Sequence, residues 1–194
     1  MNYNRLTFPS AENSLIKLQD VKDHLRIKDG TEDTLIQAYL NTAIFHYEDF
    51  TGRIVNVSEF KCTLDSFPSN GKLVELMRYP VKAIQEIKFV DADGADQVLV
   101  LEDCRIDYSE PLRLAPALNK SWPVVAPVLG AITIKFECGY ADVASLRPSA
   151  RQAILMMVGH FYNNRESVVV GRVTNEVPHS ARMLMENDKI SNRF

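Results

Sequence analysis

The sequence predicts an α+β fold in which a small helical bundle carries an inserted antiparallel β-rich subdomain. Two segments, 32–51 and 149–165, repeat apolar residues at helical spacing. Between them, several short stretches alternate polar and apolar residues, as half-buried strands do. Each predicted helix has one apolar face that needs a partner. We therefore expect the two helices to pack on each other, with the β-rich region inserted between them in sequence.

The first part of the chain predicts two helices. Residues 15–27, LIKLQDVKDHLRI, place apolar side chains at near-helical intervals, and the KDG that follows at 28–30 ends the pattern. The segment 32–51 then predicts a long helix, with Gly52 as its C-terminal stop. Its apolar stripe consists of Leu35, Ile36, Tyr39, Leu40, Ala43, Ile44, Tyr47 and Phe50.

Four alternating stretches predict strands after the second helix. They are EFKCTLDSF (59–67), KLVELM (72–77), IQEIKFV (84–90) and ITIKFEC (132–138). The turn residues SNG at 69–71 and DADG at 91–94 favour a meander of antiparallel neighbours. Residues 110–130 contain four prolines and little alternation, which favours a long irregular loop capped by Trp122 over another strand.

The C-terminal third predicts a further long helix that opens at Pro148 and ends near Arg165. After it, 168–173 predicts a short strand or an arm. Pro178 predicts the start of a last helix, HSARMLMEND.

The composition excludes several classes of protein. The formal net charge is -3, with 22 Lys plus Arg against 25 Asp plus Glu. We therefore do not expect a basic surface that binds duplex DNA as the main ligand. The N-terminus has no apolar signal core, and no stretch approaches the length of a membrane span, so we expect no membrane partner. The three cysteines are widely spaced and predict buried free thiols. Neither they nor the four histidines have metal-ligand spacing.

One stretch, HYEDFTGR at 46–53, has the composition of a catalytic cluster, with His46, Glu48, Asp49 and Arg53 close together. On a helix, Glu48 and Asp49 flank the apolar stripe of Tyr47 and Phe50, and Asp49 forms an ordinary i, i+4 pair with Arg53. We therefore interpret the stretch as a helix end, with its charged residues covering the solvent-facing or neighbour-facing side.

The segment GHFYNNRES at 159–167 raises the same question for His160. This histidine has no cysteine, serine or carboxylate at catalytic spacing. We therefore interpret it as a residue at the edge of the hydrophobic core and not as a catalytic base. No phosphate-binding glycine loop or nucleophile elbow occurs, and DADG lacks the later ligands of a calcium loop. We expect no catalytic residue, metal or cofactor.

Several segments, in order and spacing, resemble the head-to-tail connector (adaptor) proteins of long-tailed bacteriophages and prophages. The resemblance covers residues 18 to about 185, and four segments carry it. They are VKDHLRIKDGTEDTLIQAYLNTAIFHYEDFTGR, RYPVKAIQEIKFVDADG, FECGYADVASLRPSARQAILMMVGHFYNNRES and EVPHSARMLM. The layout resembles the longer members, which insert a β-rich block into a helical core.

The resemblance implies a non-enzymatic structural virion protein that joins the portal of the head to the tail. As an adaptor it would form a homo-oligomeric ring on the portal after DNA packaging, contact a tail-completion (stopper) protein, and let DNA pass through its lumen. We expect it in the virion neck, and in the host bacterial cytoplasm during assembly.

The resemblance also implies one connector domain over 1–194. It has a helical core from 15–53 and 145–166, a β-rich insertion at 55–140, and a C-terminal arm at 168–194 that docks on the portal. The expected portal or neighbour contacts in this arm are Arg172, Arg182, Met183, Leu184, Ile190, Arg193 and Phe194.

Two alternatives from other classes remain at this point. The first is a phage or bacterial regulatory module that holds a peptide or small ligand on its β block. The second is a hydrolase that uses His46 or His160.

Overall fold

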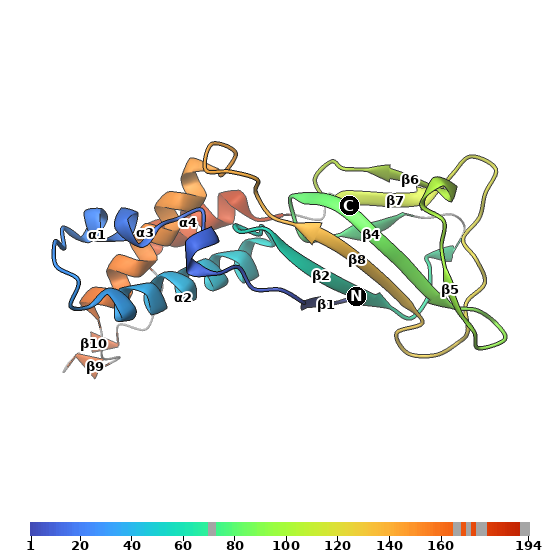
Figure 1. Cartoon of the computed structure of the whole chain (residues 1–194), viewed down its shortest axis with the longest axis horizontal. Helices are drawn as coiled ribbons and strands as arrows, with labels where there is room; N and C mark the ends of the chain where they lie inside the picture. The colour runs from blue at the N-terminus through green and yellow to red at the C-terminus, as the bar shows by residue number, and fades with distance from the viewer. Residues whose placement is uncertain (70–72, 165–167, 170–171, 174–177, 191–194) are drawn as a thin grey trace. The chain divides into compact units, whose positions relative to one another are not determined.

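The computed structural model describes residues 1–69, 73–164, 168–169, 172–173 and 178–190 (Figure 1). The chain forms two compact units. The helical unit contains residues 9–56 and 140–193, and the β unit contains residues 1–8 and 57–139. Residues 1–8, which the sequence analysis did not assign to any element, thus belong to the β unit.

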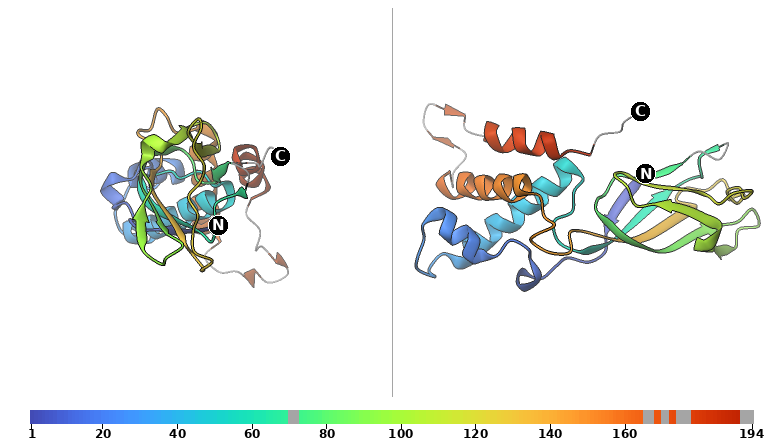
Figure 2. Two further views of the ribbon diagram at one scale, coloured as in Figure 1. Left: turned by 90° about the vertical axis from the view of Figure 1, so that its right-hand side faces the viewer. Right: turned by 90° about the horizontal axis from the view of Figure 1, so that it is seen from above.

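The described part of the helical unit contains four α-helices that pack pairwise, with α3 contacting each of the other three (Figure 2). Both long predicted helices are confirmed, and so is the last one. Pro178 lies at the N-cap of α4, and Pro148 is the first residue of α3. The four helices are α1 (Leu18–Leu25), α2 (Asp33–Thr51), α3 (Pro148–Asn163) and α4 (His179–Asp188).

Gly52 ends α2, as predicted. Its φ of 77° lies in the left-handed region that favours glycine, and its N–H donates to the carbonyl of Glu48 at 2.9 Å. The short α1 is tied to the start of α2 by Lys22, whose ammonium lies 2.7 Å from the Asp33 carboxylate. Asp33 is in the first turn of α2, where the helix dipole also favours a negative charge.

The core of the helical unit lies where the apolar stripes of α2 and α3 meet. Each fully buried aliphatic side chain there contributes about 1.5–3 kcal/mol relative to an exposed one. This burial, rather than helix propensity, holds the helices together. The fully buried residues of the two stripes are Ile36, Leu40, Ala43, Tyr47, Ala150, Ala153, Ile154, Met157 and Val158.

The β unit contains two antiparallel sheets. The five-stranded sheet has the order β1-β2-β8-β4-β5, and the three-stranded sheet has the order β3-β7-β6. Their strands are β1 (Asn2–Arg5), β2 (Ser58–Leu64), β3 (Val74–Leu76), β4 (Val81–Val90), β5 (Asp96–Val98), β6 (Cys104–Asp107), β7 (Leu112–Pro116) and β8 (Ile132–Cys138). A short pair, β9 (Val168–Val169) with β10 (Arg172–Val173), precedes α4.

Two predictions about the β region are wrong. The five-stranded sheet is not a meander, because β8 lies between β2 and β4 (Figure 1). The segment 110–130 is not one irregular loop, because its first part forms β7, the central strand of the small sheet. Pro116 sits at the end of that strand, where a missing N–H costs little. The DADG hairpin is confirmed, since it joins β4 to β5 and Asp91 accepts the N–H groups of Asp93 and Ala95.

Each sheet of the β unit has one buried face. On β2 and β8 the burial alternates strictly, so that Phe60 and Phe136 stack with their ring centroids 5.8 Å apart. Tyr3 links the two sheets, because its hydroxyl accepts the N–H of Met77 just beyond β3. Trp122 does cover part of the loop region, since its ring stacks on Phe67 with the centroids 4.4 Å apart.

All three cysteines are free, as predicted. Cys62 and Cys138 are also buried as predicted, whereas Cys104 is only partly buried. Burial raises the pKa of the Cys62 thiol from 9.0 to about 11. As the pH rises above 9, the unfolded chain loses this proton before the folded chain does. The free energy of unfolding is therefore expected to fall between pH 9 and 11 by an amount that Cys62→Ala removes.

Urea unfolding of the two proteins across this pH range measures that difference. A Cys62→Ala variant whose stability falls as steeply with pH as that of the wild type would assign the dependence to other groups, such as the Tyr3 phenol, whose pKa burial also raises.

Candidate functional site

The C-terminal helix α4 is fixed to the helical unit by the buried carboxylate of Asp188, which is 2% exposed. Three side chains donate to this carboxylate. The Tyr47 hydroxyl lies at 2.9 Å, the Ser149 hydroxyl at 2.7 Å and the Arg147 guanidinium at 3.0 Å. Tyr47 comes from α2, while Ser149 lies on α3 and Arg147 at its N-cap. One residue at the end of α4 thus joins three helices.

A second arginine completes this buried network, which we call the Asp188 cluster. Arg53 follows the end of α2, is only 2% exposed, and donates through Nε to the backbone carbonyl of Asp188. Its Nη1 also lies 3.5 Å from the Tyr140 hydroxyl. A buried carboxylate is tolerated when cations and hydrogen-bond donors surround it, and Arg53, Arg147, Tyr47 and Ser149 provide both.

The tyrosines of the cluster stay protonated. Burial, and then the charge of Asp188, raise the pKa of Tyr47 well above its ordinary value. Burial also raises the pKa of Tyr140. A phenol held in this form donates a hydrogen bond to a carboxylate but removes no proton from a substrate. The cluster is therefore built to hold α4 in place.

The stretch HYEDFTGR belongs to this junction, but two of the charged residues predicted to cover its solvent-facing or neighbour-facing side are buried. Glu48 is 4% exposed, and its carboxylate accepts the N–H of Val55 at 2.7 Å. Arg53 is buried in the Asp188 cluster. Both charges are inside because the chain turns sharply at Gly52, and the backbone leaving the helix needs buried hydrogen-bond partners.

The outer face of α4 is exposed, in contrast to its inner face. We define this outer face by Arg182, Met183 and Glu186, of which Arg182 and Glu186 form an ion pair at 3.1 Å. Met183 is 53% exposed, whereas Ala181 and Met185 are buried against the core. A methionine and an arginine on a rigid exposed helix are residues that protein interfaces favour.

The two histidines do not form a catalytic arrangement. The Nδ1 atom of His46 is covered and has no hydrogen-bond partner among the described residues, and that of His160 lies 3.3 Å from the side-chain amide of Asn164. In the described part of the chain, neither ring hydrogen-bonds to a serine, cysteine or carboxylate, and no group of His, Cys, Asp and Glu has metal-binding geometry. None of the described helices is both long and apolar enough to cross a membrane.

Residues 15–88 match the family of phage gp6-like head-tail connector proteins. The resemblance predicted from the sequence is thereby confirmed over this stretch, which runs from α1 into β4. This connector family is structural and is not known as a family of enzymes. No curated protein matches the chain significantly.

Three solved structures share the fold of this chain over its whole length. One is a chain in the neck of an empty gene transfer agent (GTA) particle computed with C6 symmetry, with a TM-score of 0.77 and 22% identity. The second is in the virion of a native GTA particle, with a TM-score of 0.78 and 22% identity. The third is in the neck of a native GTA particle computed with C12 symmetry, with a TM-score of 0.77 and 20% identity. Each match covers 100% of this chain and 98% of the other.

The residues expected at the connector interface lie in different environments. Arg182 and Met183 are on the outer face of α4. Leu184 is half-buried against the core, and Ile190 is buried, with its N–H donating to the carbonyl of Thr51. The side chain of Arg172, and the whole of Arg193 and Phe194, lie outside the described residues.

Proposed function

We propose that this chain is a structural protein of the neck of a phage or phage-like particle, where it joins the head to the tail. The observation that carries this proposal is the match of residues 15–88 to the head-tail connector family. The likeness of the whole fold to chains from GTA necks and virions supports it. In this function the protein acts by binding other proteins, not by catalysis.

Several copies form a ring in this proposal. The similar GTA necks were computed with C6 and C12 symmetry, which is what a ring of repeated subunits requires. Neighbours in such a ring contact each other through two different, complementary faces. The ring surrounds the path of the DNA, extends the exit channel, and takes its place in the neck after assembly in the host cytoplasm.

The proposed partners are the portal protein on the head side and a tail-completion (stopper) protein on the tail side. We assign the portal contact to the outer face of α4 together with Arg172, Arg193 and Phe194. The support for this assignment is that the Asp188 cluster holds α4 rigidly while Arg182 and Met183 stay exposed. A rigid helix loses little conformational entropy when it binds.

Co-expression with the portal protein of the same phage or phage-like particle tests the function. We expect a complex whose mass, measured by native mass spectrometry, corresponds to a closed ring on the portal. Negative-stain microscopy should show this ring at the portal's tail-facing end. A chain that stays monomeric with its portal, and is missing from purified particles, would contradict the proposal.

The double change Arg182→Glu and Met183→Asp is expected to reduce co-purification with the portal by about tenfold or more, because hot-spot residues of an interface each contribute about 2 kcal/mol or more. Both side chains are exposed, so the melting temperature should stay close to that of the wild type. Gln152→Glu, an exposed change on α3, serves as the control and should bind normally. Equal portal binding by the double variant and the control would remove the outer face of α4 from the interface.

A further inference from the structure

The end of the β unit where β4 turns back into β5 carries a group of exposed apolar side chains. Single exposed apolar residues are normal on a protein surface, whereas a contiguous group marks a contact with another molecule. Each member here is at least 48% exposed, and Leu118 and Leu129 are 81% and 91% exposed. We call the following six residues the apolar end: Val98, Val100, Leu118, Val124, Val128 and Leu129.

Backbone hydrogen bonds bring the two segments of the apolar end together. The N–H of Ala117 donates to the carbonyl of Asp103 at 2.9 Å, so the start of the loop lies beside the turn that follows β5. The N–H of Ala126 donates at 2.9 Å to the carbonyl of Val90, at the end of β4, and β4 pairs with β5. Both segments therefore lie at the same end of the five-stranded sheet (Figure 1).

The loop that carries four of these side chains is fixed to the β unit at several points. Trp122 stacks on Phe67, and the N–H of Gly130 donates to the Asp65 carboxylate at 2.6 Å. Ala126, in the middle of the loop, is buried. The apolar side chains are thus held outward on an anchored loop, which loses little conformational entropy when it binds a partner.

Acidic residues surround the apolar end. The segment 91–103 contains five acidic residues and no basic one. The segment 117–131 contains no acidic residue and one basic residue, Lys120, which pairs with Asp103 at 3.3 Å. Three of the acidic residues are exposed and have no ion pair within the described part of the chain: Asp93, Asp96 and Glu102.

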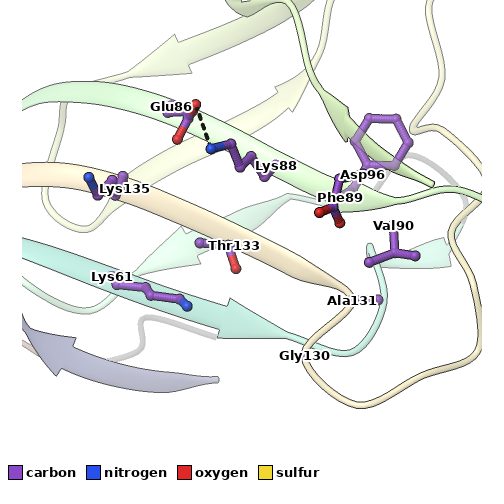
Figure 3. A pocket seen from close by; sticks show the side chains of 10 residues that line it. All are labelled: Lys61, Glu86, Lys88, Phe89, Val90, Asp96, Gly130, Ala131, Thr133 and Lys135. Carbon is purple, nitrogen blue, oxygen red and sulfur yellow. Dashed lines mark ion pairs between the residues drawn. The ribbon is translucent and has the colours of Figure 1, made fainter. Parts of the chain in front are cut away.

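The lysines of the sheet do not neutralise this acidic rim. Lys88, which lies opposite Val98 on the neighbouring strand, is paired with Glu86 at 3.1 Å. Lys61 and Lys135 lie farther back along β2 and β8, as Figure 3 shows. The apolar end therefore has an excess of negative charge.

We propose that the apolar end binds the tail-completion (stopper) protein, through a surface of that protein that is apolar at its centre and rimmed by lysine or arginine. The proposal rests on the neck function above, in which the chain joins two different partners. The portal contact is assigned to α4 in the helical unit, whereas the apolar end belongs to the β unit. Protein interfaces commonly bury an apolar centre within a polar rim, and opposite charges on the two rims speed association.

A second copy of this chain is the competing occupant, and charge disfavours it. If two copies met through their apolar ends, the acidic rim of one would face the acidic rim of the other, and like charges weaken an interface. Other exposed apolar side chains of the chain offer no basic rim either. Phe45 on α2 is followed one turn later by the exposed Asp49, and Met183 on α4 lies beside the ion pair of Arg182 with Glu186.

The test measures binding of the tail-completion protein of the same particle to the full chain assembled on its portal, by biolayer interferometry. The double variant Val124→Asp with Leu129→Asp is expected to bind about tenfold more weakly or worse, because it places charges in the apolar centre of the interface. Both side chains are exposed, so the melting temperature and the assembly on the portal should match the wild type.

The matched control is Leu6→Asp with Tyr108→Asp. These two side chains are 42% and 47% exposed and belong to the same β unit, but lie outside the apolar end. The control introduces the same two charges and should bind the tail-completion protein within about twofold of the wild type.

Neutralising the rim tests the charge independently of the apolar centre. Asp93→Asn with Glu102→Gln is expected to slow association by about threefold or more at low ionic strength, with the dissociation rate almost unchanged. The difference should shrink as salt is added, because salt screens exposed charges. Faster association of this variant would show that the partner's rim is not basic and would overturn the proposed chemistry.

The outcomes separate this proposal from the neck function. Equal binding by the wild type and the Val124 and Leu129 variant would overturn the proposal, as would a wild-type chain that assembles on the portal but does not bind the tail-completion protein. Loss of the closed ring in that variant would identify a second copy as the occupant and would also overturn it. A wild-type chain that forms no ring on the portal and is absent from particles would reject the neck function itself.

Discussion

Replacing Asp188 with alanine is expected to lower the free energy of unfolding by about 2–4 kcal/mol, because it leaves the Tyr47 and Ser149 hydroxyls without their acceptor. The carboxylate is 2% exposed and accepts from Tyr47, Ser149 and Arg147. The backbone carbonyl of residue 188, which accepts from Arg53, remains in the variant, so the loss comes from the contacts of the carboxylate. Urea unfolding followed by far-UV circular dichroism measures the change.

Two variants separate the role of Asp188 from a general effect of altering α4. Asp188→Asn keeps the shape and an oxygen acceptor but removes the charge, so its cost should lie between those of alanine and the wild type. Asn187→Ala changes the exposed neighbouring residue and should shift stability by no more than about 0.5 kcal/mol. Equal stability of Asp188→Ala and Asn187→Ala would show that the cluster does not hold α4.

The helices could be predicted because their signals are local. The apolar stripe of 32–51 and the stop at Gly52 lie within the helix they define, and Pro148 marks the start of its own helix. These signals depend on the 3.6-residue period and on backbone conformation, neither of which needs a distant partner.

The order of the strands could not be predicted, because it depends on which distant segments pair. The sequence contains β8 as a clear alternating strand, but nothing in its pattern places it between β2 and β4. β1 was missed because NYNR is polar, and it forms a strand by pairing with the edge of β2. β7 was not predicted because it lies in a proline-rich segment and its alternation of apolar and polar residues extends over only five positions.

The Asp188 cluster was missed for a similar reason. Tyr47 and Asp188 are 141 positions apart, and Arg53 and Asp188 are 135 apart. An acid in an exposed-looking run such as MENDK gives no sign that it will be buried. Tyr47 and Arg53 of HYEDFTGR both have a partner in Asp188 on the last helix, and only the structure shows that contact.

Phe136→Ala is expected to destabilise the β unit by about 3–5 kcal/mol, the range for removing a buried phenylalanine ring. Phe136 is fully buried on β8, the central strand of the five-stranded sheet, and its ring stacks on Phe60. Its loss leaves a cavity at the point where β2 and β4 are joined, so the sheet cannot easily close around it. A stable domain has only about 5–15 kcal/mol in total, so this one change removes a large share.

Trp122 provides the measurement, since it is the single tryptophan of the chain and stacks on Phe67 within the β unit. Its fluorescence should report unfolding of Phe136→Ala at a lower urea concentration than for the wild type. Val98→Ala is the control, because this side chain on β5 is 58% exposed and its truncation removes little buried area. If both variants unfold at the same urea concentration, removal of the Phe136 ring costs the β unit no more stability than truncation of an exposed side chain. That result would contradict the prediction.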